Sequence, residues 1–208
     1  MLGIKIAILY GLKPHELGFC GPQEEKNKGI LSQYINGKNI DKKKIKELLK
    51  EFEGAYPYYE LIAKSNNIKD PFNKQVIRAY WIGNKLLEKV KSNAHHSFHV
   101  LIIGSVTGRI ELKGELLDIC RVGWGRVKER SPKLKVEYQS FVGKKQLKLG
   151  ELVYKEIEWN KAFLPNLKVG DWVSFHWNQA IEILNKKDIE NLKKYTQISL
   201  DAYNKKVI

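Results

Sequence analysis

The residues in this chain best suited to metal chemistry are its 2 cysteines and 5 histidines. Cys20 lies between glycines in the segment GFCGP at residues 18–22, which predicts a loop or turn with an accessible backbone. His95, His96 and His99 form a cluster, and either a helical or an extended backbone places two of these imidazoles on one face. Thiolates and imidazoles bind iron, zinc and copper. These four residues are therefore candidates for metal or cofactor contact.

The same histidines also fit a structural role, because imidazoles can cap a helix end and bond to carbonyl groups at a polar junction. Cys20 could supply a soft ligand to a site built on them, but the sequence does not show whether the two segments meet. A second thiol, Cys120, has Arg121 beside it. Positive surroundings and partial exposure favour the thiolate that metal binding requires, whereas a buried lone cysteine acts as a small hydrophobe.

The elements that position these residues change character along the chain. Residues 1–90 are expected to be mostly helical, on the evidence of apolar stripes at helical spacing and of two aspartates placed as N-caps, Asp41 and Asp70. The predicted elements are a helix or short strand at 4–10, broken after Gly11 and Pro14, and helices at 41–52, 56–63 and 70–90.

Beyond Cys120 the pattern is that of short strands. Apolar and polar residues alternate at 134–139, and further extended stretches are expected at 153–159, 172–176 and 180–184, followed by a helix from 185 onward. The segment 107–119 is expected to bridge to them. We therefore predict an α+β protein with a mainly helical domain at 1–116 and, at 117–208, a small OB-like β-barrel with a C-terminal helix.

Charge is the strongest feature of the composition, with 37 basic against 23 acidic side chains and a formal net charge of +14. Such an excess can indicate nucleic-acid binding. Because it is spread over both halves of the chain, a lysine-rich surface of the thermophilic type explains it better. No apolar run reaches the length of about 18 residues that a membrane helix needs, and the N-terminus lacks a signal-peptide cleavage pattern. We expect a cytoplasmic protein.

Three segments of the second half resemble the HypC/HupF family of hydrogenase maturation chaperones. The segment CRVGWGRV at 120–127 has the family's spacing from a leading cysteine to a Gly-Lys/Arg-Val motif. The segment LKVGDWVSFH at 167–176 is similar to the family's Gly-Asp strand with its histidine, and AIEIL at 180–184 follows in the same order. The whole chain also resembles an uncharacterised prokaryotic family with GFCGP-like and HHSFHV-like segments.

The resemblance implies a function. In that family the cysteine and the histidine serve the delivery of an Fe(CN)2CO unit to nickel–iron hydrogenase, together with a HypD-like iron–sulfur protein and the precursor of the hydrogenase large subunit. By this likeness Cys120 is the candidate iron-binding thiolate and His176 its supporting ligand. The neighbouring side chains are candidate partner contacts: Arg121, Trp124, Arg126 and Trp177.

This chain departs from the family pattern in that Cys120 is internal, Trp124 stands where a proline is usual, and Trp177 follows the histidine in place of a glycine-containing turn. Three hypotheses are therefore carried forward. The first is an assembly chaperone, not an enzyme, that binds iron transiently. The second is a nucleic-acid-binding barrel that uses exposed tryptophans as stacking platforms. The third is a metal- or thiol-dependent enzyme built on Cys20 and the histidine cluster.

Overall fold

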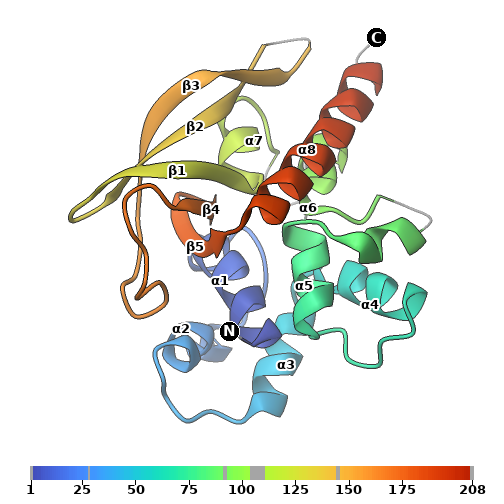
Figure 1. The fold of residues 1–208 in the computed structure, drawn as a ribbon. Helices are drawn as coiled ribbons and strands as arrows, with labels where there is room; N and C mark the ends of the chain where they lie inside the picture. Colours follow the sequence, from blue (N-terminus) through green and yellow to red (C-terminus); the bar gives the residue numbers. More distant parts are fainter. Residues whose placement is uncertain (1, 28, 91–92, 104–110, 144–145, 207–208) are drawn as a thin grey trace.

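A computed structural model describes residues 2–27, 29–90, 93–103, 111–143 and 146–206 of the chain (Figure 1). It confirms the α+β class, with helices through the first part, a five-stranded antiparallel sheet after them and a long helix at the end. The helices α2–α5 gather at one end of the molecule and the sheet lies at the other, with α1 beneath strands β4 and β5 (Figure 1).

The first helix, α1 (Gly3–Glu16), continues through the two residues that were expected to break it. Gly11 is tolerated because the ring of Phe52 fills the space of its missing side chain: a Cβ there would lie 2.6 Å from the ring. Pro14 lies in the last turn, where the loss of one backbone N–H does not stop the preceding turns from forming. The expected break at Gly11 and Pro14 was wrong, because packing outweighs local propensity here.

Four further helices follow: α2 (Ile30–Ile35), α3 (Lys42–Lys50), α4 (Tyr56–Ser65) and α5 (Lys74–Trp81). Asp41 caps α3 as predicted, since its side chain accepts a hydrogen bond from the backbone of Lys43. The helix expected at 70–90 is shorter. Asp70 caps only a turn, by accepting from the backbone of Phe72, and Asn73 is the true N-cap of α5.

Short helical segments form the junction between the helical half and the barrel. α6 (His96–Phe98) leads into a π-helical turn, η3 (His99–Ile103), and α7 (Glu115–Cys120) ends at the second cysteine. Residues 107–110 of the expected bridging segment lie outside the described residues. Two 3-10 turns complete the helical part, η1 (Glu25–Asn27) and η2 (Lys85–Lys89).

The predicted strands are all present in a sheet of order β3-β2-β1-β4-β5. Their bounds are β1 (Gly123–Arg130), β2 (Leu134–Val142), β3 (Lys148–Ile157), β4 (Trp172–His176) and β5 (Gln179–Leu184). Just beyond β3, Glu158 forms a parallel bridge with Gln179 at the start of β5. The two outer strands therefore meet, and the sheet curls into a partly closed five-stranded barrel of the OB type.

The last helix, α8 (Lys186–Lys206), packs back across the junction. Two residues that follow Cys120, Val122 and Trp124, belong to the same apolar core as the N-terminal helices, as do Ile181, Leu184 and Leu192. The barrel has a second core of its own. The expected boundary at 116/117 is thus crossed by a shared core. Among the described helices, none has the length and hydropathy needed to cross a membrane.

Candidate metal centre

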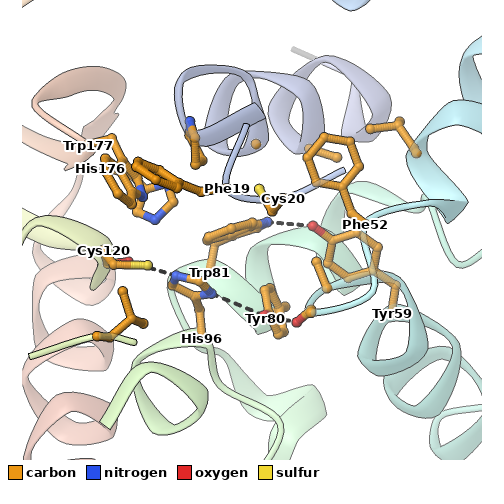
Figure 2. Close-up of a pocket in the computed structure, with 17 residues that line it drawn as sticks. Phe19, Cys20, Phe52, Tyr59, Tyr80, Trp81, His96, Cys120, His176 and Trp177 are labelled. Atoms are coloured by element: carbon orange, nitrogen blue, oxygen red, sulfur yellow. Dashed lines mark hydrogen bonds between the residues drawn. The ribbon is translucent and has the colours of Figure 1, made fainter. Parts of the chain in front are cut away.

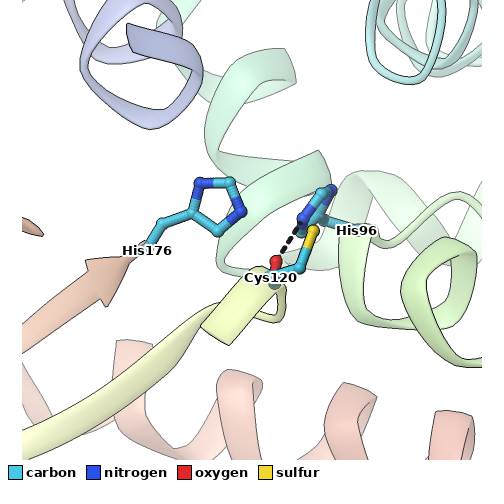
Figure 3. Close-up of side chains that lie close together, drawn as sticks. All are labelled: His96, Cys120 and His176. Atoms are coloured by element: carbon cyan, nitrogen blue, oxygen red, sulfur yellow. Dashed lines mark hydrogen bonds between the residues drawn. The ribbon is translucent and has the colours of Figure 1, made fainter. Parts of the chain in front are cut away.

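Three buried side chains, His96, Cys120 and His176, converge at the junction between the helices and the barrel (Figure 3). One ligand atom from each lies within 4.8 Å of the others. Bonds of about 2.0–2.3 Å to a tetrahedral ion imply ligand separations of about 3.5 Å. Small rotations of these side chains would therefore close them around one ion.

His176 is held by the backbone of α1. Its Nδ1 lies 2.7 Å from the carbonyl oxygen of Tyr10, and because a carbonyl can only accept, Nδ1 carries the proton. That carbonyl is available because its normal helical donor is the residue four positions on, Pro14, which has no N–H. The other nitrogen, Nε2, is therefore the unprotonated one. It is buried and makes no hydrogen bond in the described part of the chain, although the carbonyl of Cys120 lies close enough to influence the pKa of the ring.

This arrangement is the one that metal-binding histidines usually show, with one ring nitrogen donating to a carbonyl and the other facing the ion. Burial lowers the pKa of His176 to about 4, against the opposing effect of the backbone carbonyls at Tyr10 and Cys120. The imidazole is therefore neutral at physiological pH and can act as a ligand.

His96 is held on both sides. Its Nε2 lies 2.8 Å from the carbonyl oxygen of Cys120, and its Nδ1 lies 3.0 Å from the hydroxyl of Tyr80. The hydroxyl has one proton, which it can donate either to His96 Nδ1 or to the carbonyl of Gly54, and its oxygen also lies 3.2 Å from Nδ1 of His99. Burial, reinforced by the nearby His176, lowers the pKa of His96 well below its usual range, so this imidazole is neutral as well.

Cys120 ends α7 and is buried. Burial raises the pKa of its thiol to about 12, while the Trp177 side chain acts in the opposite direction. The indole Nε1 of Trp177 is otherwise a buried donor with no hydrogen-bond partner among the described residues. The thiol is therefore protonated when the site holds no cation, and Trp177 is placed to stabilise the thiolate that would form on metal binding.

Trp177 lies in a strained turn. It and Asn178 form the two-residue turn between β4 and β5, with φ values of 50° and 58°. Positive φ at both positions is the geometry of a type I′ hairpin turn, which normally takes Asn-Gly. A bulky side chain in this conformation is an outlier that costs of order 1–3 kcal/mol. The backbone N–H of Trp177 bonds to Ile119, so the turn is tied to the end of α7 beside Cys120.

A small apolar cavity of about 50 Å³ adjoins the three ligands (Figure 2). Trp81 forms a central wall and stacks on Tyr10 with ring centroids 4.6 Å apart. Its indole Nε1 donates to the hydroxyl of Tyr59 over 2.7 Å. The lining is mostly aromatic and aliphatic: Ala7, Pro14, Phe19, Leu49, Phe52, Ala55, Tyr59, Tyr80, Trp81, Leu112 and Trp177.

Of the residues predicted to contact a metal, the structure brings four to this cavity and leaves two outside it. Cys20 lines the same cavity as His96, Cys120 and His176 (Figure 2). His95 instead stacks on Tyr195, and His99 packs against Tyr58 with ring centroids 3.6 Å apart. Both are buried but neither belongs to the three-residue cluster. His99 shares the hydroxyl of Tyr80 with His96, at 3.2 Å from its Nδ1, but of the three imidazoles only His96 also meets Cys120 and His176. The histidine segment thus supplies one ligand candidate.

The four predicted partner contacts differ in their burial. Arg121, Trp124 and Trp177 are buried, so they are not available to a partner in this structure, whereas Arg126 is exposed. Arg121 is paired with Asp118 at 2.8 Å, and Trp124 packs into the core that the barrel shares with the helices. These three side chains are buried because the helices cover this face of the barrel.

Sequence reasoning missed the residues that orient the ligands, namely Tyr10, Pro14 and Tyr80. A proline within an otherwise apolar helical stretch was the one available signal, because it leaves a carbonyl without its helical donor. Nothing in the sequence indicated that a histidine of the barrel would donate a hydrogen bond to that carbonyl.

A family model described as a family of unknown function (DUF6390) matches residues 3–94 and 91–208. No curated protein and no solved structure matches the chain.

Proposed function

Because the chain belongs to the family of unknown function DUF6390, we propose its function from its site residues and from its resemblance to HypC-type chaperones. The proposed function is that of an accessory chaperone in metallocentre maturation, which binds an iron cargo at Cys120, His176 and His96. The cargo would be the Fe(CN)2CO unit of nickel–iron hydrogenase or a related iron fragment. A HypD-like protein and the hydrogenase large-subunit precursor would be its partners. The site would work in the cytoplasm, where thiols stay reduced.

The observation that carries the proposal is the convergence of ligand atoms from distant segments. Cys120 and His176, which the resemblance to HypC-type chaperones pairs, have ligand atoms within 4.8 Å of each other, and His96 joins them from the helical half. The Nε2 of His176 is buried without a hydrogen bond among the described residues, as are the Nε2 atoms of His95 and His99. What sets this cluster apart is that His176 lies beside a thiol and a second imidazole. A buried polar atom without a partner is costly, which favours a ligand at this point.

The donor set fits iron. One thiolate and two neutral imidazoles suit iron, zinc or copper and do not suit calcium or magnesium, which prefer oxygen ligands. Structural zinc sites are closed by four protein ligands, whereas three protein ligands leave a position open. A site with an open position can hold a cargo and release it to another protein, as the proposal requires.

The residues around His96 allow it to change its protonated nitrogen. When the site holds no cation, the Nε2 proton is bonded to the carbonyl of Cys120. Ligation through Nε2 needs the proton on Nδ1, where it donates to the hydroxyl of Tyr80, while that hydroxyl donates to the carbonyl of Gly54. The iron would act as the Lewis acid. The hydrogen-bond partners of His96 would determine which of its ring nitrogens carries the proton. Cys120 would bind as the thiolate, with its thiol proton passing to water as the iron enters.

One observation favours the enzyme alternative. The apolar cavity beside the three ligands could hold a small substrate at the open position. The nucleic-acid alternative loses support, because Trp124 and Trp177 are buried and Trp172 is only partly exposed. Stacking platforms need exposed rings.

Anaerobic titration with Fe²⁺ and with Co²⁺, whose thiolate charge-transfer absorption reports sulfur ligation, tests the site. We expect one ion per chain, and a loss of affinity of at least about 100-fold in Cys120→Ser, His96→Ala and His176→Ala, because even second-sphere changes cost 10–100-fold. The matched controls are His95→Ala and His99→Ala, equally buried histidines outside the cluster. Equal losses in all four histidine variants would show general unfolding and contradict the site.

Copurification from the native host separates the functions. Recovery of a HypD-like protein or a hydrogenase subunit with the wild-type chain, lost in Cys120→Ser, is the expected result. Turnover of a small substrate by the purified metal-loaded protein alone would support the enzyme instead. Salt-dependent binding of single strands that is unaffected by Cys120→Ser would support the nucleic-acid alternative.

A further inference from the structure

The segment Leu17–Pro22 carries Cys20 to the outer wall of the cavity (Figure 2). Of the residues that line the cavity, only Phe19, Cys20 and Gly54 are partly exposed, and all the others are buried. Gly54 has no side chain. Cys20 is therefore the one metal-binding side chain of the cavity wall that also reaches solvent.

The cavity has buried polar atoms at its inner end. Among the described residues, His176 Nε2 makes no hydrogen bond and Trp177 Nε1 has none apart from its interaction with the Cys120 thiol, and the two side chains are 2% and 8% exposed. Cys120 lies beside them and is also buried. The cavity thus has one thiol, Cys20, at its outer wall, and a second thiol and an imidazole, Cys120 and His176, at its inner end.

The loop between these two ends is shaped by two glycines in the left-handed conformation. Gly18 and Gly21, with φ of 78° and 77°, flank Phe19 and Cys20. Gly18 has open space around it, whereas a side chain at Gly21 would meet the ring of Phe52 at 2.6 Å. Phe19 stacks on Trp177 with ring centroids 4.8 Å apart and lines the same cavity as the inner ligands.

We propose that Cys20 is the capture ligand of this site, which takes the incoming metal from solvent or from a donor protein and passes it beneath Phe19 to Cys120, His96 and His176. The inference rests on the proposed function, since it assumes a metal cargo. The step is a ligand exchange without change of oxidation state. The metal–sulfur bond to Cys20 breaks as the bond to Cys120 forms, and the proton leaving the Cys120 thiol returns to Cys20.

The kinetics of loading test this role. Stopped-flow transfer of Co²⁺ from a chromophoric chelator should be slower in Cys20→Ser by about tenfold or more, while the equilibrium affinity stays within about threefold, because the final ligands are intact. Cys120→Ser should lose most of the thiolate absorption, and any that remains should come from Cys20 and disappear in Cys20→Ser/Cys120→Ser. A Cys20→Ser variant that loads at the wild-type rate overturns the proposal. So does one that loses affinity as severely as Cys120→Ser, since Cys20 would then be a permanent ligand.

A second experiment needs no metal and therefore separates this inference from the proposed function. In the metal-free protein, a small methylthiolating reagent should modify Cys20 rapidly and Cys120 slowly. Phe19→Ala should speed modification of Cys120 by about tenfold or more, if the ring covers the path and burial limits thiol reactivity. Leu17→Ala, an exposed residue of the same loop that does not line the cavity, is the matched control.

The two outcomes are distinct. If the wild-type protein takes up no Co²⁺ and Cys120 still becomes reactive in Phe19→Ala, the proposed function fails and the path through the loop stands. If Phe19→Ala leaves the Cys120 rate unchanged, or Leu17→Ala accelerates it equally, the path is wrong whether or not the site binds metal.

Discussion

The interior of the barrel and the contact between the barrel and the helices are held together in different ways. The barrel interior is almost wholly apolar, comprising Val127, Leu134, Val136, Tyr138, Ile157, Leu164, Leu167, Val173, Phe175 and Ala180. The contact, here called the seam, combines the apolar core shared with the helices and a set of buried polar links. Those links join Tyr10 and Arg78 of the helices to Ser174, His176, Glu182 and Asp188.

The difference explains where the candidate site lies. Apolar burial stabilises without fixing direction, so a barrel interior tolerates small rearrangements. Hydrogen bonds and ion pairs fix angles as well as distances. A metal site needs ligand atoms held to within about half an ångström, and the seam is the part of the molecule whose bonds can do that.

The largest expected effect is at the seam. Arg78 pairs with Glu182 at 3.2 Å and with Asp188 at 2.9 Å, and these three side chains are mostly buried. Arg78→Ala leaves two buried carboxylates without their cation and should lower the free energy of unfolding by about 3–5 kcal/mol. Urea unfolding measures this. The exposed Arg126→Ala should change it by no more than about 0.5 kcal/mol, and equal effects from both would erase the distinction drawn here.

Acid should weaken the helical side and the seam selectively, because the barrel interior contains no histidine. Burial lowers the pKa of His95 to about 3, and lowers those of His99 and His176 to about 4. Below about pH 6.5 the unfolded chain therefore binds protons that the folded chain does not. Stability should fall as pH drops from about 6.5 toward 4, by up to about 1.4 kcal/mol per pH unit for each histidine.

Unfolding at fixed temperature between pH 4 and pH 8 measures this slope. The variant His99→Gln should reduce the slope of stability against pH by the contribution of one histidine, up to about 1.4 kcal/mol per pH unit. A stability that stays constant from pH 7 to pH 5 would mean that these imidazoles are protonated in the folded state, contrary to their burial.

Pro14→Ala should separate ligand geometry from stability. The new backbone N–H would compete with His176 for the carbonyl of Tyr10, which now accepts from Nδ1 at 2.7 Å. Metal affinity should drop by about tenfold, as for other second-sphere changes, while the free energy of unfolding stays the same or rises because alanine is the better helix former. Pro57→Ala, in the first turn of α4, is the control. An unchanged Co²⁺ affinity in Pro14→Ala would show that the proline does not govern His176.

The smallest effect belongs to the barrel interior. Ile157→Val removes one buried methylene and should lower the free energy of unfolding by about 0.5–1.5 kcal/mol. Metal affinity should not change, because Ile157 belongs to the barrel core and does not line the cavity. A loss of affinity comparable to that of Pro14→Ala would mean that barrel packing also sets the ligand positions.

Local sequence patterns predicted the elements that depend on local rules. The alternation at Leu134, Val136 and Tyr138 marks a strand with one buried face, and all three side chains are buried in β2. The N-cap at Asp41 was found for the same reason, since capping involves only neighbouring residues. The start of α5 was misplaced because two nearby residues, Asp70 and Asn73, both offer a capping side chain.

The metal candidates were also named from the sequence, including Cys20, His96, Cys120 and His176, because thiols and imidazoles are few and chemically distinctive. The sequence could not separate His96 from His95 and His99. That choice depends on which imidazole of a short helix meets the end of α7 and β4, and both lie far from it along the chain.

The sequence by itself determined the α+β class, the strands of the barrel and the short set of residues able to bind a soft metal, because these follow from residue type and from periodicity over a few positions. Only the tertiary structure decided that three of those residues share one buried site, that Cys20 stands at its outer wall, and that Pro14 frees a carbonyl for His176. The physical reason is that ligand geometry is fixed by hydrogen bonds between segments up to 166 positions apart, which no local pattern encodes.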